Sequence, residues 1–98
     1  MMNKKIWIVE ADNNECWSEP IIMENAKDAE EYVRREYEAA CLAMAQSKNV
    51  FDEWLIVNGT GIASISNGMG DYYNWRITEY TISLNDCDNA KITLAVKL

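Results

Sequence analysis

Apolar side chains lie on both faces of a predicted strand near the N-terminus. Ile6 and Ile8 alternate with Trp7 and Val9, and alternation at every second position is typical of a β-strand. A strand with apolar residues on both faces is usually buried on both. The pattern therefore predicts a central β-strand at residues 4–10.

Turn-forming residues separate this strand from a second one. Residues 12–15 read Asp-Asn-Asn-Glu, and short polar side chains of this kind stabilise the backbone of turns. Residues 16–23 are then predicted to form another strand. Because Pro20 has no N–H to donate to a neighbouring strand, we expect an edge position or a bulge there.

An amphipathic helix is predicted from residue 26 to about residue 46. Asn25 is the expected N-cap, with Asp28 at the third helical position. Mostly small apolar residues recur at helical spacing, which lets the helix lie close to a sheet. This stripe consists of Ala26, Ala29, Val33, Tyr37, Ala40 and Met44. Leu42 falls on the opposite, polar face.

Two Asn-Gly dipeptides predict consecutive hairpins in the middle of the chain. Asn58-Gly59 and Asn67-Gly68 bracket a short alternating segment, and Asn-Gly favours the tight turn of a hairpin. An irregular loop over residues 54–66 is the alternative. Residues 72–84 and 92–98 are then predicted to form an antiparallel hairpin closed by the polar loop 85–89.

These elements predict an α+β fold in a single acidic domain spanning residues 1–98. The simplest packing places one amphipathic helix on one face of a mainly antiparallel sheet of about 4–6 strands. A single helix covers only one face of such a sheet. The other face must therefore be exposed to solvent, closed by loops or covered by a partner.

The charge balance disfavours direct binding to nucleic acids or membranes. Sixteen acidic residues against nine basic ones give a net charge of −7, which repels phosphate backbones and anionic lipids. No Lys or Arg occurs between Ile6 and Ala26 or between Asn49 and Trp75. Because no apolar run approaches the roughly 20 residues of a membrane-spanning helix, and no signal-peptide core is evident, we expect a cytoplasmic protein.

Catalytic chemistry has few candidates in this sequence. Histidine is absent, which removes the commonest general base and metal ligand. The three cysteines, Cys16, Cys41 and Cys87, are widely spaced and suggest reduced structural thiols. Carboxylate pairs remain as candidates for acid–base chemistry, but a chain this small rarely holds two of them across a cleft. We expect a protein that is not an enzyme.

Cofactor and metal sites are not expected either. The segments Gly59-Thr60-Gly61 and Gly68-Met69-Gly70 lack the lysine and the following helix of a phosphate-binding loop. Asp86, Asp88 and Asn89 lack the glycine and closing glutamate of a calcium loop. These glycines are therefore assigned to turns and the acidic residues to a solvated loop.

Acidic and aromatic residues within or beside the cation-free stretches are the candidate partner-binding residues. We expect the carboxylates to attract a basic protein, such as one that binds nucleic acids, and the aromatic rings to anchor the contact. The candidates are Asp12, Glu15, Trp17, Glu19, Asp52, Glu53, Asp71, Tyr72 and Tyr73. An acidic surface that serves only solubility, and aromatic rings that belong to the core, are the alternatives.

The overall character of the chain is similar to that of small phage-borne inhibitors of host nucleases, including anti-CRISPR proteins. The similarity lies in small size, cation-free stretches and absent catalytic chemistry, and it covers no alignable motif. It implies an inhibitor that mimics the phosphate array of a nucleic acid. The alternative is a structural homo-oligomer, for example a homodimer, that associates through an uncovered sheet face or an edge strand.

Overall fold

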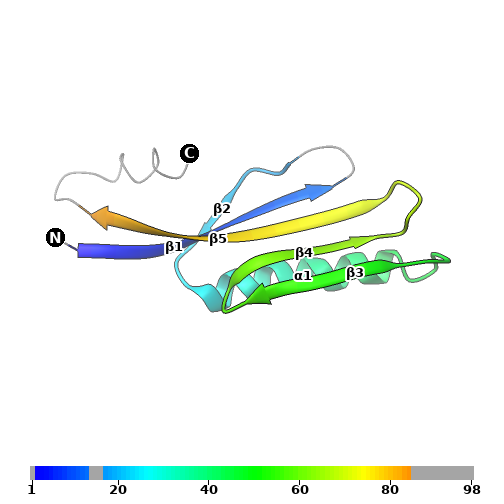
Figure 1. Cartoon of the computed structure of the whole chain (residues 1–98), viewed down its shortest axis with the longest axis horizontal. Coiled ribbons are helices and arrows are strands. Elements are labelled where there is room, and N and C mark those ends of the chain that lie inside the picture. Colours follow the sequence, from blue (N-terminus) through cyan, green and yellow to red (C-terminus); the bar gives the residue numbers. More distant parts are fainter. Residues whose placement is uncertain (1, 14–16, 85–98) are drawn as a thin grey trace.

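The computed structural model describes residues 2–13 and 17–84, which form one helix packed on one face of a five-stranded antiparallel sheet (Figure 1). The strands are β1 (Met2–Asn13), β2 (Ile21–Met23), β3 (Phe51–Val57), β4 (Thr60–Ser66) and β5 (Tyr72–Leu84), and the helix is α1 (Ala26–Ala43). Their order across the sheet is β2-β1-β5-β4-β3. The predicted α+β architecture is confirmed.

The first predicted strand is central, as its two apolar faces indicated. β1 lies between β2 and β5 and pairs with β5 over its whole length. Val9 faces the helix and belongs to the main core, with Trp7 packed against it. Ile6 and Ile8 point to the opposite face, where they are buried in a smaller cluster with Ile82.

The second strand is shorter than predicted. β2 contains three residues, Ile21–Met23, that pair with β1 at the edge of the sheet. Pro20 immediately precedes it, and a residue without an N–H cannot extend the ladder. Trp17 makes only an isolated bridge to Asp12, and residues 14–16 lie outside the described part of the chain.

Helix α1 begins as predicted and ends three residues early. The Asn25 side chain accepts a hydrogen bond from the backbone N–H of Asp28 at 2.7 Å, which caps the first turn. Ala29, Val33, Ala40 and Met44 are buried against the sheet, whereas Leu42 is 78% exposed. Met44 is the C-cap.

Both Asn-Gly turns join neighbouring strands, which resolves the middle of the chain as two hairpins rather than a loop. At the β3–β4 turn, Asn58 and Gly59 have φ angles of 54° and 76°, and positive φ at both central residues is what this tight turn requires. The longer β4–β5 turn is held by Asn67, whose side-chain oxygen accepts from the N–H groups of Met69 and Asp71. The predicted strand 92–98 and loop 85–89 lie outside the described residues.

The main core lies between α1 and the sheet. Trp75 and Ile77 of β5, Ala63 and Ile65 of β4, and Ile56 of β3 are buried there. Within residues 2–13 and 17–84 the opposite face carries no helix, and we call it the open face. Figure 1 looks onto the open face, with α1 behind the sheet.

Candidate functional site

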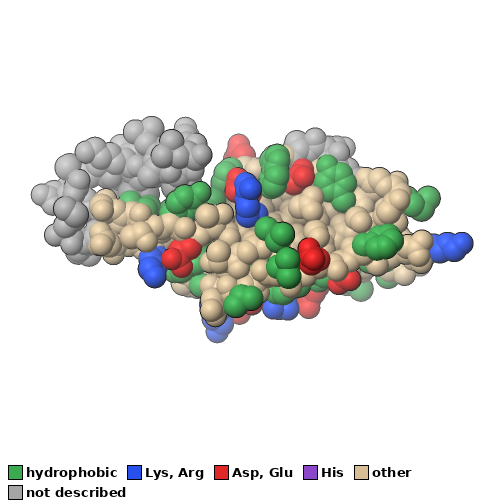
Figure 2. Space-filling view, viewed as in Figure 1, with side chains coloured by type: hydrophobic (Ala, Val, Ile, Leu, Met, Phe, Trp, Pro, Cys, Tyr) green, Lys and Arg blue, Asp and Glu red, His purple; other side chains and the backbone are tan. Residues whose placement is uncertain are grey.

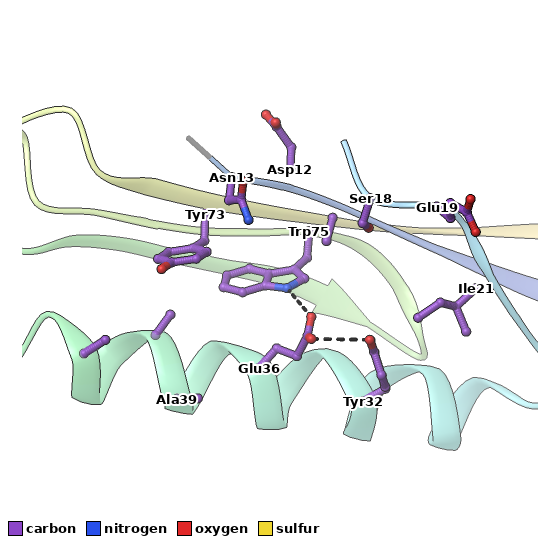
Figure 3. Close-up of a pocket in the computed structure, with 13 residues that line it drawn as sticks. Asp12, Asn13, Ser18, Glu19, Ile21, Tyr32, Glu36, Ala39, Tyr73 and Trp75 are labelled. Carbon is purple, nitrogen blue, oxygen red and sulfur yellow. Dashed lines mark hydrogen bonds between the residues drawn. The ribbon is translucent and has the colours of Figure 1, made fainter. Parts of the chain in front are cut away.

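A pocket of about 390 Å³ opens between α1 and the sheet, near the end of β1 and the start of β5 (Figure 3). We call it the Glu36 pocket. Small or apolar residues of β1, β2 and α1 form part of its lining. Its polar and aromatic lining residues are Asp12, Asn13, Ser18, Glu19, Tyr32, Glu36, Tyr73 and Trp75. The small residues Ala39, Ala40 and Ala43 of α1 leave the space that the pocket occupies.

Glu36 is held in a defined position inside this pocket. Its Oε1 accepts a hydrogen bond from Trp75 Nε1 at 3.0 Å, and its Oε2 accepts one from the Tyr32 hydroxyl at 3.3 Å. Figure 3 shows the carboxylate reaching from α1 toward the indole ring, with Tyr32 one turn away on the same helix. Both donors are neutral, so the negative charge of the carboxylate is not compensated by them.

Aromatic rings form the sheet side of the pocket. Tyr73 and Trp75 are successive helix-facing residues of β5, and their rings stack with centroids 6.0 Å apart and planes 13° apart. Tyr37 of α1 meets the Trp75 ring edge-on at 5.8 Å. Trp75 is buried in this arrangement and Tyr73 is half-buried, so of these two rings Tyr73 exposes the larger fraction of its surface.

Among the residues that the structure describes, no Lys or Arg side chain lines the Glu36 pocket. Elsewhere in the described residues, acidic side chains do have cationic neighbours: Glu10 pairs with Arg76, Glu24 with Lys4, Glu30 with Arg34 and Glu79 with Lys5. Glu36 and Glu19 take part in none of these pairs. The pocket therefore combines uncompensated carboxylates with aromatic walls, an arrangement that suits a cationic group.

Two other tryptophan rings, those of Trp54 and Trp17, each have an arginine guanidinium of the same chain lying over them. The guanidinium of Arg34 lies 4.5 Å from the Trp54 ring centroid, and that of Arg76 lies 5.3 Å from the Trp17 ring centroid. Within the described residues, no cation lies over Trp75. Trp75 is 3% exposed, and the part of its indole that faces the pocket is the N–H bonded to Glu36.

Local environment also raises the pKa of tyrosines in this region. Burial, followed by the nearby Glu36 carboxylate, raises the pKa of Tyr32 above its ordinary value. Burial and the hydrogen bond to Asp52 raise the pKa of Tyr37 as well. Both hydroxyls therefore remain protonated donors at neutral pH, and neither is activated as a base.

Three of the predicted partner-binding residues border the Glu36 pocket. Tyr73 forms part of its aromatic wall, and Glu19 lies at its margin in the segment before β2. Asp12 also borders it, but Figure 3 shows its carboxylate pointing away from the helix. Asp12 belongs to a cross-strand row of the open face that also contains Asn74, Ser64 and Glu53.

A second group of predicted residues lies at the same end of the sheet. Asp52, Glu53 and Tyr72 line a shallow depression beside Phe51. Asp52 is not free, because its carboxylate accepts a hydrogen bond from the Tyr37 hydroxyl. Glu53 and Tyr72 point to the open face, so the fold divides the predicted residues between its two faces.

The remaining predicted residues have local roles or are not described. Asp71 accepts a hydrogen bond from Asn67 Nδ2 at 2.9 Å within the β4–β5 turn. Trp17 is 52% exposed and lies under Arg76. Glu15 lies outside the described residues.

Sequence reasoning missed Glu36 and Tyr32, and it did not include Trp75 among the candidate residues. Trp75 is indeed 3% exposed, but its N–H faces the pocket. One signal was available for Glu36, because residues 29, 33, 36 and 40 follow helical spacing and the other three are buried apolar residues. Glu36 itself is exposed, so it lies at the margin of this stripe, where its carboxylate reaches the Trp75 donor on the sheet.

The one cysteine in the described residues has the properties of a structural thiol. Cys41 is half-buried and unpaired. Burial, followed by the carboxylates of Asp52 and Glu38, raises the pKa of its thiol. A raised pKa lowers the fraction of reactive thiolate at neutral pH. Cys16 and Cys87 lie outside the described residues.

Among the described residues, no group of Cys, Asp or Glu side chains is placed to hold a metal ion. Helix α1, the one helix described, is not long and apolar enough to span a membrane. Comparison of the chain with protein-family models, with curated proteins and with solved structures found no match.

Proposed function

We propose that this chain is a non-enzymatic binding module that recognises a basic protein. The observation that carries the proposal is the Glu36 carboxylate, held by Trp75 and Tyr32 in an aromatic pocket that no Lys or Arg of the described residues lines. A lysine or arginine side chain of the partner would enter this pocket. There it would meet the exposed Glu36 carboxylate and contact the half-buried Tyr73 ring.

The net charge of −7 supports a basic partner. A negative field speeds the approach of a positively charged protein and repels acidic ones. Proteins that bind nucleic acids carry such basic surfaces, so we propose one of them, in the cytoplasm, as the partner. Occupying its basic groove would make this chain an inhibitor that competes with nucleic acid.

A small probe tests the pocket without knowledge of the partner. Acetyl-arginine methylamide is titrated into isotopically labelled protein, and the indole N–H resonance of Trp75 is followed by NMR. We expect this resonance to shift, and the shift to weaken as salt is added. The isosteric neutral probe, acetyl-citrulline methylamide, should produce no comparable shift. Equal responses to the two probes would contradict the cation-binding proposal.

A matched pair of variants assigns the response to one charge. Glu36→Gln keeps an acceptor for Trp75 but removes the negative charge, and it should abolish the arginine response. Glu38→Gln makes the same chemical change on the same helix outside the pocket, so it should leave the response intact. If both variants show the same shift with the arginine probe, the response comes from the overall negative charge of the protein and not from binding in the pocket.

Identification of the partner requires capture from a lysate, followed by elution with increasing salt. We expect one basic protein to be retained at low salt and released at high salt. Reversal of Asp12 and Glu19 to lysine should abolish its capture, whereas reversal of Glu31 and Glu38 on the helix surface should not. Competition between the captured protein's nucleic acid and this chain then tests the inhibitor role. Simultaneous binding of both would refute that role.

A further inference from the structure

The outer edge of β3 is available for strand pairing. In the part of the chain that the structure describes, β3 has β4 as its single neighbour. Within these described residues, the other edge of β3 has no neighbouring strand and presents unpaired backbone N–H and C=O groups along Phe51–Val57. By contrast, the edge strand β2 has three residues and follows Pro20. β3 is therefore the better template for an added strand.

The sequence of β3 contains few of the features that protect an edge strand. It reads FDEWLIV, with no proline, glycine or lysine, which are among the residues that natural proteins use to block edge pairing. Its register with β4 runs without a bulge from Phe51–Ser66 to Val57–Thr60. The two acidic residues, Asp52 and Glu53, are its only charges.

Apolar side chains of β3 are exposed on the open face. Phe51 is 61% exposed, Leu55 is 52% exposed and Val57 is 69% exposed. Ile62 of β4, the cross-strand neighbour of Leu55, is also exposed. Figure 2 shows separate hydrophobic side chains on this face, with acidic and basic side chains lying between them.

We propose that β3 pairs with β3 of a second copy of this chain, antiparallel, about a two-fold axis that passes through Trp54. The two sheets then form one continuous sheet with both helices on the same side. This interface lies at β3, whereas the proposed cation pocket lies between α1 and the opposite part of the sheet. The proposal is therefore independent of the proposed function.

The side-chain pattern of β3 is complementary to itself in this register. Phe51 lies opposite Val57 of the second copy, and symmetry repeats this apolar pair at the other end of the interface. Leu55 lies opposite Glu53 of the second copy, so no carboxylate faces another carboxylate. The two Asp52 residues are four positions apart along the strand, which corresponds to about 14 Å and exceeds the Debye length of about 8 Å at physiological salt.

Neighbouring registers are less favourable. A shift by one residue would place the helix-facing side chains of one copy beside the open-face side chains of the other. An axis at Glu53 would set the two Glu53 carboxylates directly opposite each other. An axis at Leu55 would shorten the overlap and leave Phe51 without an apolar partner. The axis at Trp54 is the one that pairs all seven residues of β3.

The interface is one strand wide, and it is small compared with the roughly 1,200–2,000 Å² of a standard stable interface. We therefore expect a reversible dimer. Sedimentation equilibrium between about 10 µM and about 1 mM should show the average mass rising from 11.2 kDa toward twice that value with concentration. A constant mass of 11.2 kDa over this range would overturn the proposal.

Two lysine substitutions on the same strand test the register. Val57→Lys places a cation against Phe51 of the second copy and should abolish the dimer. Leu55→Lys places a cation against Glu53 of the second copy, so the dimer should persist and become salt-sensitive. In the register centred on Leu55 the outcomes would be reversed. There Leu55→Lys would set two introduced cations opposite each other, and Val57→Lys would place its cation against Glu53. That reversal would overturn the proposal.

Leu42→Lys is the matched control, because it replaces an exposed leucine of α1 with the same cation far from β3. It should dimerise like the unmodified protein. Thermal unfolding followed by circular dichroism checks that each variant folds. Persistence of the dimer in folded Val57→Lys would show that association uses another surface and would refute the proposal.

Discussion

Trp75 Nε1 donates a hydrogen bond to Glu36 Oε1 at 3.0 Å, which joins strand β5 to the middle of helix α1. The indole is 3% exposed, so its N–H has little access to water as an alternative acceptor. A buried donor without a partner is costly. This bond therefore positions the carboxylate of the candidate pocket and also stabilises the contact between helix and sheet.

Removal of the Glu36 carboxyl group should destabilise the fold. Glu36→Ala leaves the Trp75 N–H without its acceptor, and we expect a loss of about 1–3 kcal/mol in the free energy of unfolding. Glu36→Gln retains an acceptor oxygen and should lose less. Urea denaturation followed by tryptophan fluorescence measures both. Equal losses in the two variants would show that charge, and not the hydrogen bond, provides the stabilisation.

The Tyr37–Asp52 hydrogen bond should make stability fall at alkaline pH. Because the pKa of Tyr37 is raised in the folded protein from its ordinary value of 10, the unfolded chain loses this proton first as pH rises. The contribution of this hydrogen bond to the free energy of unfolding is therefore complete below pH 10 and decreases above it. The measurement is the free energy of unfolding at about pH 8 and about pH 11, on either side of an ordinary tyrosine pKa.

Tyr37→Phe should reduce this alkaline loss, because phenylalanine has no proton to release. At about pH 8 the variant should also be less stable by about 1 kcal/mol, the typical value of a lost hydrogen bond. Tyr80→Phe, which removes an exposed hydroxyl from β5, is the control and should change neither quantity. An alkaline loss that is as large in Tyr37→Phe as in the unmodified protein would exclude Tyr37 as its source.

The β3–β4 turn should tolerate no side chain at Gly59. Its φ is +76°, and a Cβ there would lie 2.5 Å from the Ala26 Cβ at the start of α1. Backbone strain and overpacking together should cost about 2–4 kcal/mol in Gly59→Ala. Gly70→Ala has positive φ but open space around it, so it should cost only about 1–2 kcal/mol of backbone strain. Similar losses in both variants would mean that the contact with Ala26 relaxes freely.

Cys41 should be a slow nucleophile in the folded protein. Burial and the carboxylates of Asp52 and Glu38 raise the pKa of its thiol, which lowers the thiolate fraction that reacts with iodoacetamide. Peptide mapping by mass spectrometry should show slower modification of Cys41 in buffer than in urea. A rate in buffer equal to that in urea would contradict the raised pKa.

The candidate site was predicted less completely than the fold. Asp12, Glu19 and Tyr73 were identified from charge and aromatic character, and they border one pocket. Glu36 and Trp75 are 39 residues apart in sequence, and no local pattern indicates that they meet. The fold also divided the predicted carboxylates, because neighbouring residues of a strand, such as Asp52 and Glu53, point to opposite faces.

Local sequence determined the elements of this protein. Alternation in residues 6–9 indicated a central strand, Asn25 and Asp28 marked the start of the helix, and two Asn-Gly pairs located the turns, because each signal depends on neighbouring residues. Only the tertiary structure decided the strand order, the Glu36 pocket and the exposed edge of β3. Those features arise from contacts between segments that are distant in the chain. Their energies depend on packing geometry, which local sequence patterns do not reveal.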